Sequence, residues 1–235
     1  MKLSSIIALL FALILSACNG DGKMIRDTEL HGYQNGHLRI KMDEKLQEIK
    51  LESGEPGYLL TTKINYSEGR KKRVSTLTRT WMKTDYSLVR KENKTFKADI
   101  LTEEFHVHTK GKDVIVTDFK DGKAGKEETI SWTENSIILS EPLPSMYLQD
   151  LPKVGDQKAY WIFYDPMRGS APVRVKNKEK VTVTYGDKSY ECFRYSVRSM
   201  SNAGKYNDYY VDTKDGSIVK IVVANIEFVP PGTHR

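Results

Sequence analysis

The sequence predicts a mainly β protein, built as a single curved antiparallel sheet that forms an open half-barrel with one short helix near residues 144–151. Two observations carry this prediction. Short runs of alternating apolar and polar residues follow one another almost to the end of the chain, with turn signals about every eight to twelve residues. Helical spacing is scarce, and no internal repeat or low-complexity segment interrupts the pattern.

The first series of expected strands begins near residue 37. Residues 37–51 begin with alternation and drift toward helical spacing, so their type stays open between strand and helix. A turn follows at residues 52–57. Further strands are expected at residues 58–66, 73–82, 86–90, 105–108, 113–119 and 137–139, with a tight hairpin at Asp121-Gly122.

The helix and the second series of strands follow. Pro144 to Leu151 is the best helical segment, and it is bracketed by prolines on both sides. Strands are then expected at residues 157–164, 173–176, 180–185, 189–198, 206–212 and 217–229. The proline-rich residues 142–153 leave open a division into two halves. We favour one continuous sheet, with the helix across its concave side or its mouth.

The N-terminus has the pattern of an export signal. Ile6 to Leu15 is an unbroken apolar run of about ten residues, which is too short to cross a bilayer. The segment that ends this run, Leu15-Ser16-Ala17-Cys18, resembles the lipobox of bacterial lipoproteins. The resemblance implies that residues 1–17 are a signal peptide and that Cys18 carries lipid, including an amide-linked acyl chain such as palmitate. Two or three acyl chains hold a protein stably on a membrane.

The same resemblance addresses localisation. Asn19, rather than Asp, follows the cysteine, which favours the periplasmic face of the outer membrane in a host with two membranes. Residues 18–36 are polar and contain four glycines, so we expect a lipidated flexible tether there and a β-rich globular domain over residues 37–235.

The charge is positive and unevenly distributed. The formal net charge is +6, and residues 63–97 hold eleven Lys and Arg against three acidic residues. The densest basic patch is Arg70, Lys71, Lys72 and Arg73. Anionic lipid headgroups, acidic polysaccharide or an acidic protein would suit this region, and a solvated strand face is the alternative. Nucleic acid is not an expected partner for an envelope protein.

Candidate chemistry is sparse. Glu104, His106 and His108 alternate, so they share one face of a strand, but a zinc site lacks a fourth ligand. The spacing of Asp208, Asp212 and Asp215 fails the calcium-loop pattern. Standard catalytic motifs are absent. We therefore expect a non-enzymatic protein with no catalytic residues, no metal site and no cofactor.

The cysteine count also favours a protein without a catalytic cysteine. The chain has two cysteines, so lipidation of Cys18 leaves Cys192 without a disulfide partner. Nothing in the local sequence supplies a base to activate Cys192 as a nucleophile, so we expect a buried, inert thiol.

The body of the chain resembles the open half-barrel of periplasmic lipoprotein carriers and receptors and of related exported domains of unknown role. The resemblance rests on Leu151–Asp156, before an aromatic strand, and on Tyr209–Lys220. It implies a concave face that binds acyl chains, which the abundant aromatic residues would line. Our first hypothesis is binding of an apolar or amphipathic ligand or a lipidated partner in that face. The alternative is an interaction protein that binds acidic glycan or protein through residues 63–97.

Overall fold

The computed structural model describes residues 22–68, 72–111, 113–131, 138–139, 144–164, 169–200 and 206–233. These residues form one fifteen-stranded sheet that does not close, with β8 and β9 at its two free edges. The strand order is β8-β7-β6-β5-β4-β3-β2-β1-β15-β14-β13-β12-β11-β10-β9. Neighbours are antiparallel except for β9 and β10, which run parallel. The predicted fold class is confirmed.

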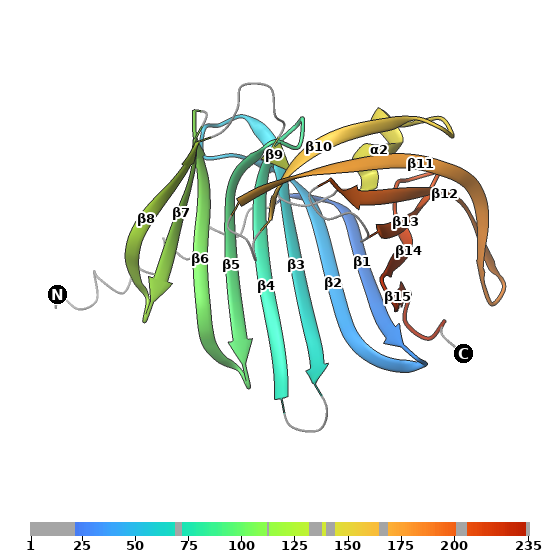
Figure 1. Cartoon of the computed structure of the whole chain (residues 1–235), viewed down its shortest axis with the longest axis horizontal. Coiled ribbons are helices and arrows are strands. Elements are labelled where there is room, and N and C mark those ends of the chain that lie inside the picture. Colours follow the sequence, from blue (N-terminus) through green and yellow to red (C-terminus); the bar gives the residue numbers. More distant parts are fainter. Residues whose placement is uncertain are drawn as a thin grey trace, which may run out of the picture.

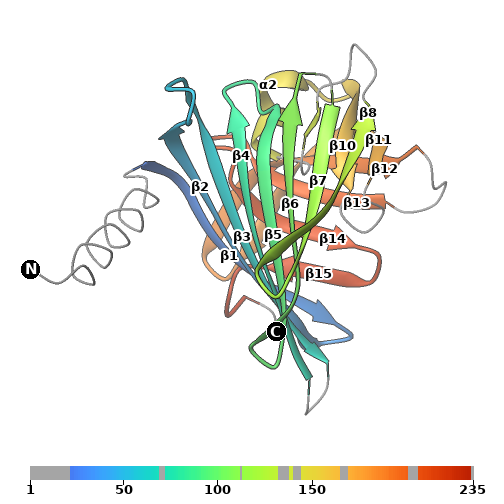
Figure 2. The ribbon, with the colours of Figure 1, turned by 90° about the vertical axis from the view of Figure 1, so that its left-hand side faces the viewer.

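The sheet has two arms that meet where β1 pairs with β15. The first arm contains β1 (Lys23–Gln34), β2 (His37–Lys50), β3 (Pro56–Glu68), β4 (Lys72–Lys83), β5 (Leu88–Lys97), β6 (Ile100–Lys110), β7 (Asp113–Lys120) and β8 (Lys123–Ser131). The second arm contains β9 (Ile138–Leu139), β10 (Gln157–Tyr164), β11 (Gly169–Tyr185), β12 (Lys188–Ser199), β13 (Tyr206–Asp212), β14 (Ile218–Val223) and β15 (Ile226–Val229). Figure 1 shows the upper strands of the second arm crossing the first arm steeply. Figure 2 shows the same crossing from the side.

Within the described residues α2 (Pro144–Asp150) is the one helix, at the predicted position. It lies in the concavity between the arms and joins them in one apolar core. Leu46, Leu60 and Met82 enter this core from the first arm, and Tyr160, Val175 and Tyr195 enter it from the second. The ring of Tyr147 on α2 lies 5.3 Å from that of Tyr195. Because α2 packs on both arms, residues 142–153 do not separate two domains.

The N-terminal boundary differs from the sequence prediction. Residues 23–34, expected as part of a tether over 18–36, form the central strand β1, so the globular domain begins before residue 37. Leu30 is fully buried there, and Arg26 forms a buried ion pair with Glu44. Gly32 reflects close packing rather than flexibility, since a Cβ at that position would lie 2.8 Å from Cε1 of Phe228. The predicted signal peptide and Cys18 lie outside the described residues.

Other strand boundaries also differ from the sequence prediction. The ambiguous segment 37–51 is a strand, β2, over nearly its whole length. The two strands expected at 173–176 and 180–185 are one long strand, β11, with an irregularity between Asn177 and Glu179 that bends it. The strand expected at 217–229 is instead the hairpin β14–β15, with Ala224 at a φ of 52° in its turn.

Candidate ligand-binding pocket

A pocket with a volume of about 440 Å³ lies on the first arm. Strands β4 to β7 form its floor, and the turn after β2 forms one wall. We call it the Trp81 pocket. It is lined by Leu51, Glu52, Ser53, Trp81, Val89, Arg90, His106, Val107, His108, Thr109, Thr117 and Phe119.

Strand register places most of these side chains on the outer face of the sheet. Thr80, Lys91 and Val107 stand opposite one another on β4, β5 and β6, and all three are buried on the inner face. A second row of residues lies next to this one, shifted by one residue on each strand. In it Trp81 pairs with Arg90, and Arg90 pairs with His108. Because side chains alternate between the faces, the side chains of this second row point away from the core.

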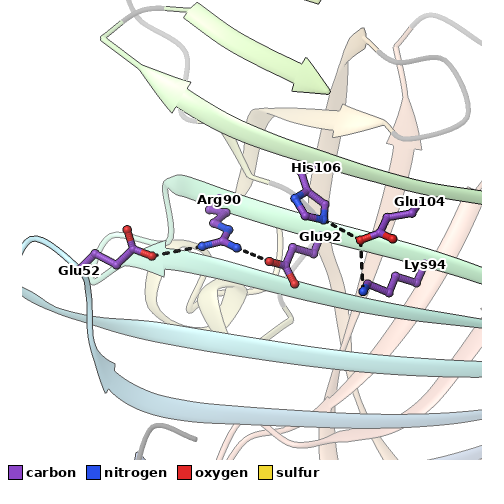
Figure 3. A network of polar contacts seen from close by, with 6 residues as sticks. All are labelled: Glu52, Arg90, Glu92, Lys94, Glu104 and His106. Carbon is purple, nitrogen blue, oxygen red and sulfur yellow. Dashed lines mark hydrogen bonds and ion pairs between the residues drawn. The ribbon is translucent and has the colours of Figure 1, made fainter. Parts of the chain in front are cut away.

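Arg90 joins the wall of the pocket to its floor. Its Nη1 donates a 3.1 Å hydrogen bond to Oε1 of Glu52 in the turn after β2, and its Nη2 donates to Glu92. The guanidinium carbon lies 4.9 Å from the centre of the Trp81 ring, so Arg90 also makes a cation–π contact. Figure 3 shows Arg90 held between the two carboxylates.

Glu104 is the centre of a second polar group, which reaches the pocket through the lining residue His106. Its Oε1 lies 3.0 Å from Nε2 of His106 and 3.1 Å from Nζ of Lys94 (Figure 3). Burial acts to raise the pKa of Glu104, but hydrogen bonds from Lys94 and His106 outweigh it and hold that pKa below its ordinary value. The ring of His106 lies 4.2 Å from that of Phe119, which fixes one side of the pocket.

The structure brings together two of the three residues considered for zinc. Glu104 and His106 are in contact, as the alternation predicts, and His108 lines the Trp81 pocket from the same strand. No group of three or more His, Cys, Asp or Glu in the described ranges could hold a metal ion.

The aspartates considered for calcium have local roles. Asp212 and Asp215 accept hydrogen bonds from the backbone N–H groups of Lys214 and Ser217, at 2.9 Å and 2.8 Å. These contacts fold the turn between β13 and β14. Gly216 has a φ of 73°, which is the conformation that favours glycine.

Cys192 is fully buried in β12. Burial, followed by the nearby charges of Asp212 and Glu191, raises the pKa of its thiol to about 12. A thiol with such a pKa is not a thiolate at neutral pH, which agrees with an inert role.

The basic patch is only partly visible. Arg70 and Lys71 lie outside the described residues, and Lys72 is the first residue of β4. Arg73 is exposed. Elsewhere in residues 63–97, Arg90 and Lys94 pair with carboxylates and Lys91 is completely buried. The positive charge of this region is therefore not one continuous free surface.

The sequence prediction missed the pocket because it placed the ligand on the concave face. Near α2 that face is filled by the core, in which Tyr147, Tyr160 and Tyr195 are each at most 2% exposed. The aromatic residues that line a pocket, Trp81 and Phe119, point to the other side. These side chains could have been found from the sequence only by assigning the register of successive hairpins. That register places Trp81, Arg90 and His108 side by side.

Comparison with known proteins gives a fold but no family. No protein-family model and no curated protein matches this sequence. The chain is similar to a beta-barrel-like protein of domain of unknown function DUF1849 from Brucella abortus, a crystal structure. The TM-score is 0.55 at 11% identity, over 88% of this chain and 95% of that one. The class of protein is thus an open β-barrel domain of a kind found in bacteria. No helix in the described part of the chain is long and apolar enough to cross a membrane.

Proposed function

We propose that this protein is a non-enzymatic, lipid-anchored protein of the bacterial cell envelope that binds an amphipathic small molecule in the Trp81 pocket. The observation that carries the proposal is the pocket itself. Its volume of about 440 Å³ lies within the range of small-molecule sites, and its walls combine apolar surface with a few polar groups.

The lining specifies the kind of ligand. Leu51, Trp81, Val89 and Phe119 offer apolar and aromatic surface to an alkyl chain or a flat ring. His106 and His108 offer imidazole nitrogens to a hydroxyl, carbonyl or similar polar group. The ligand is therefore apolar over most of its surface, with one hydrogen-bonding end.

The charges of the pocket are balanced. Arg90 is held by Glu52 and Glu92, and Lys94 is held by Glu104. Since neighbouring carboxylates compensate these cations, the pocket favours an uncharged polar end over a strongly anionic one. Binding should therefore change little between low and physiological salt. A complex that weakens steeply with salt would instead favour the basic residues 63–97 and an acidic glycan or protein partner.

The anchor completes the proposal. Removal of residues 1–17 would leave Cys18 at the N-terminus with lipid on it, five residues before the start of β1. With Asn19 next to Cys18, we place the protein on the periplasmic face of the outer membrane where the host has two membranes.

The test is native mass spectrometry of the mature lipidated chain, released from its host envelope in mild detergent. Wild type should carry an additional mass that dissociates as a small amphipathic molecule, and Trp81→Ala should lose it. Tyr190→Ala is the matched control, because Tyr190 packs against Tyr185 on the second arm and does not line the pocket. Retention of the mass in Trp81→Ala, or its absence from wild type, would contradict the proposal.

A further inference from the structure

The β1–β2, β3–β4, β5–β6 and β7–β8 connections all lie at one edge of the first arm, which we call the distal edge (lower edge in Figure 1). The chain enters the sheet at the opposite edge, where β1 begins. The distal edge has a surface chemistry of its own.

Apolar side chains gather there. Leu38, Tyr66, Ile100 and Leu101 are four of the eight large apolar side chains that are exposed in the described residues. Ile100 is the most exposed of the eight, at 69%. An apolar side chain so exposed beside a hairpin turn is suited to burial in a partner.

Basic side chains surround these apolar ones. Arg39, Arg73, Lys97, Lys120 and Lys123 are exposed within three residues of the strand ends at this edge. Their exposed acidic neighbours are three, Asp99, Glu103 and Asp121.

The hairpin that presents Ile100 is strained. Ala98 and Asp99 form its two-residue turn with φ values of 50° and 64°, a conformation that favours Asn and Gly. The backbone N–H of Ala98 donates a 2.9 Å hydrogen bond to the carbonyl oxygen of Arg73, which holds the turn beside β4. Strained backbone that is held in this way is typical of functional segments.

From these features we infer that the distal edge docks onto the anionic surface of the membrane that carries the protein's own anchor. Exposed apolar residues with lysines and arginines around them suit the boundary between headgroups and acyl chains. A flat acidic protein surface would use the charges but not Ile100 and Leu101.

The position of the anchor selects its own membrane as the partner. Five residues span the distance from Cys18 to Lys23, about 17 Å when fully extended. Strand β1 is 12 residues long, or about 40 Å. Because the tether is so short, the folded body stays beside its membrane. When the strands of the first arm run parallel to the membrane plane, the distal edge reaches the same membrane surface. The inference rests on the anchoring part of the proposed function and not on the ligand.

The test uses the lipidated mature chain in vesicles of phosphatidylethanolamine and phosphatidylglycerol. Ile100→Cys carries an environment-sensitive fluorophore, and Val154→Cys, which is also exposed but lies on the second arm, is the control. Cys192 is buried and Cys18 would carry lipid on its sulfur, so only the added cysteine reacts. Leu101→Cys repeats the measurement if Ile100→Cys fails to fold.

Spin-labelled lipids should quench the fluorophore at position 100 and leave the one at position 154 unchanged. Lys97→Gln and Arg73→Gln should each lower the ratio of docked to undocked protein about fivefold, and pure phosphatidylcholine vesicles should abolish the difference. Equal quenching at positions 100 and 154 would overturn the inference. Quenching that occurs only when the spin-labelled lipids are in separately added vesicles, and not in the vesicles that hold the anchor, would overturn it as well. A mature chain without an acyl mass would overturn the anchoring itself, which separates the two failures.

Discussion

The side-chain amide of Asn177 donates a 3.0 Å hydrogen bond to the carbonyl oxygen of Leu151, the residue that follows α2. Asn177 is fully buried at the bend of β11, so this bond joins the end of the helix to the second arm. The hydroxyl of Tyr195 donates to the same oxygen at 3.2 Å. Two side chains from adjacent strands therefore fix the helix that fills the concavity.

Removal of this amide should destabilise the protein. Asn177→Ala leaves Tyr195 as the remaining donor and creates a small cavity, so the free energy of unfolding should fall by about 1–3 kcal/mol. Urea denaturation followed by circular dichroism measures it. Lys178→Ala, an exposed neighbour, should change stability by less than about 0.5 kcal/mol. Equal effects of the two substitutions would contradict the role given to Asn177.

Gly32→Ala should weaken the pairing of β1 with β15. The new methyl group would lie 2.8 Å from Cε1 of Phe228, and the overpacking should cost about 1–3 kcal/mol of stability. Phe228→Leu removes the obstructing ring, so the double variant should be more stable than the sum of the two single effects predicts. Simple additivity in this cycle would show that the ring of Phe228 is not the obstacle.

The stability contributed by Glu104 should depend on pH. The pKa of its carboxyl is lowered on folding from an ordinary value of 4.5, so the ionised form stabilises the fold. The difference in stability between wild type and Glu104→Gln should be fully present above pH 4.5 and disappear as the pH falls through the lowered pKa. Unfolding curves measured across this range test the sign. The exposed Glu127→Gln is the control, and a difference that grows on acidification would refute the assignment.

Thiol counting should report on both cysteines. With its pKa raised to about 12 and no exposure, Cys192 should not react with a disulfide reagent at pH 8 in the folded protein. If Cys18 carries lipid on its sulfur, as proposed, the mature chain in guanidinium should react with one equivalent of the reagent, through Cys192 alone. Two equivalents would show that Cys18 is free, and rapid reaction of folded protein would show that Cys192 is accessible.

The sequence allowed most of the sheet to be predicted, because alternation and turn residues are local signals. The prolines around residues 144–151 marked α2 equally well. The prediction failed at β1, since Gly32 in a polar stretch has the composition of a linker. That stretch pairs along its length with β2, and the close contact that requires a glycine at position 32 comes from Phe228, nearly two hundred residues away.

The Trp81 pocket shows a second limit. The alternation of Glu104, His106 and His108 correctly placed these side chains on one face, and the contact between Glu104 and His106 follows from it. The remaining lining comes from the turn after β2 and from β4, β5 and β7, whose positions depend on register shifts such as the one between Trp81 and Met82. Such shifts leave no local trace in a sequence.

The pairing of β1 with β15 also sets the order in which the sheet can be completed during synthesis. Strand β1, the first in the chain, lies at the centre of the sheet. One of its two neighbours there is β15, the last strand to be synthesised. A nascent chain therefore cannot join its two arms until nearly all of it has been translated. Loss of even the final hairpin would leave β1 as an open edge, available for pairing with other chains. Closure of the sheet between its two arms is thus coupled to completion of the chain itself.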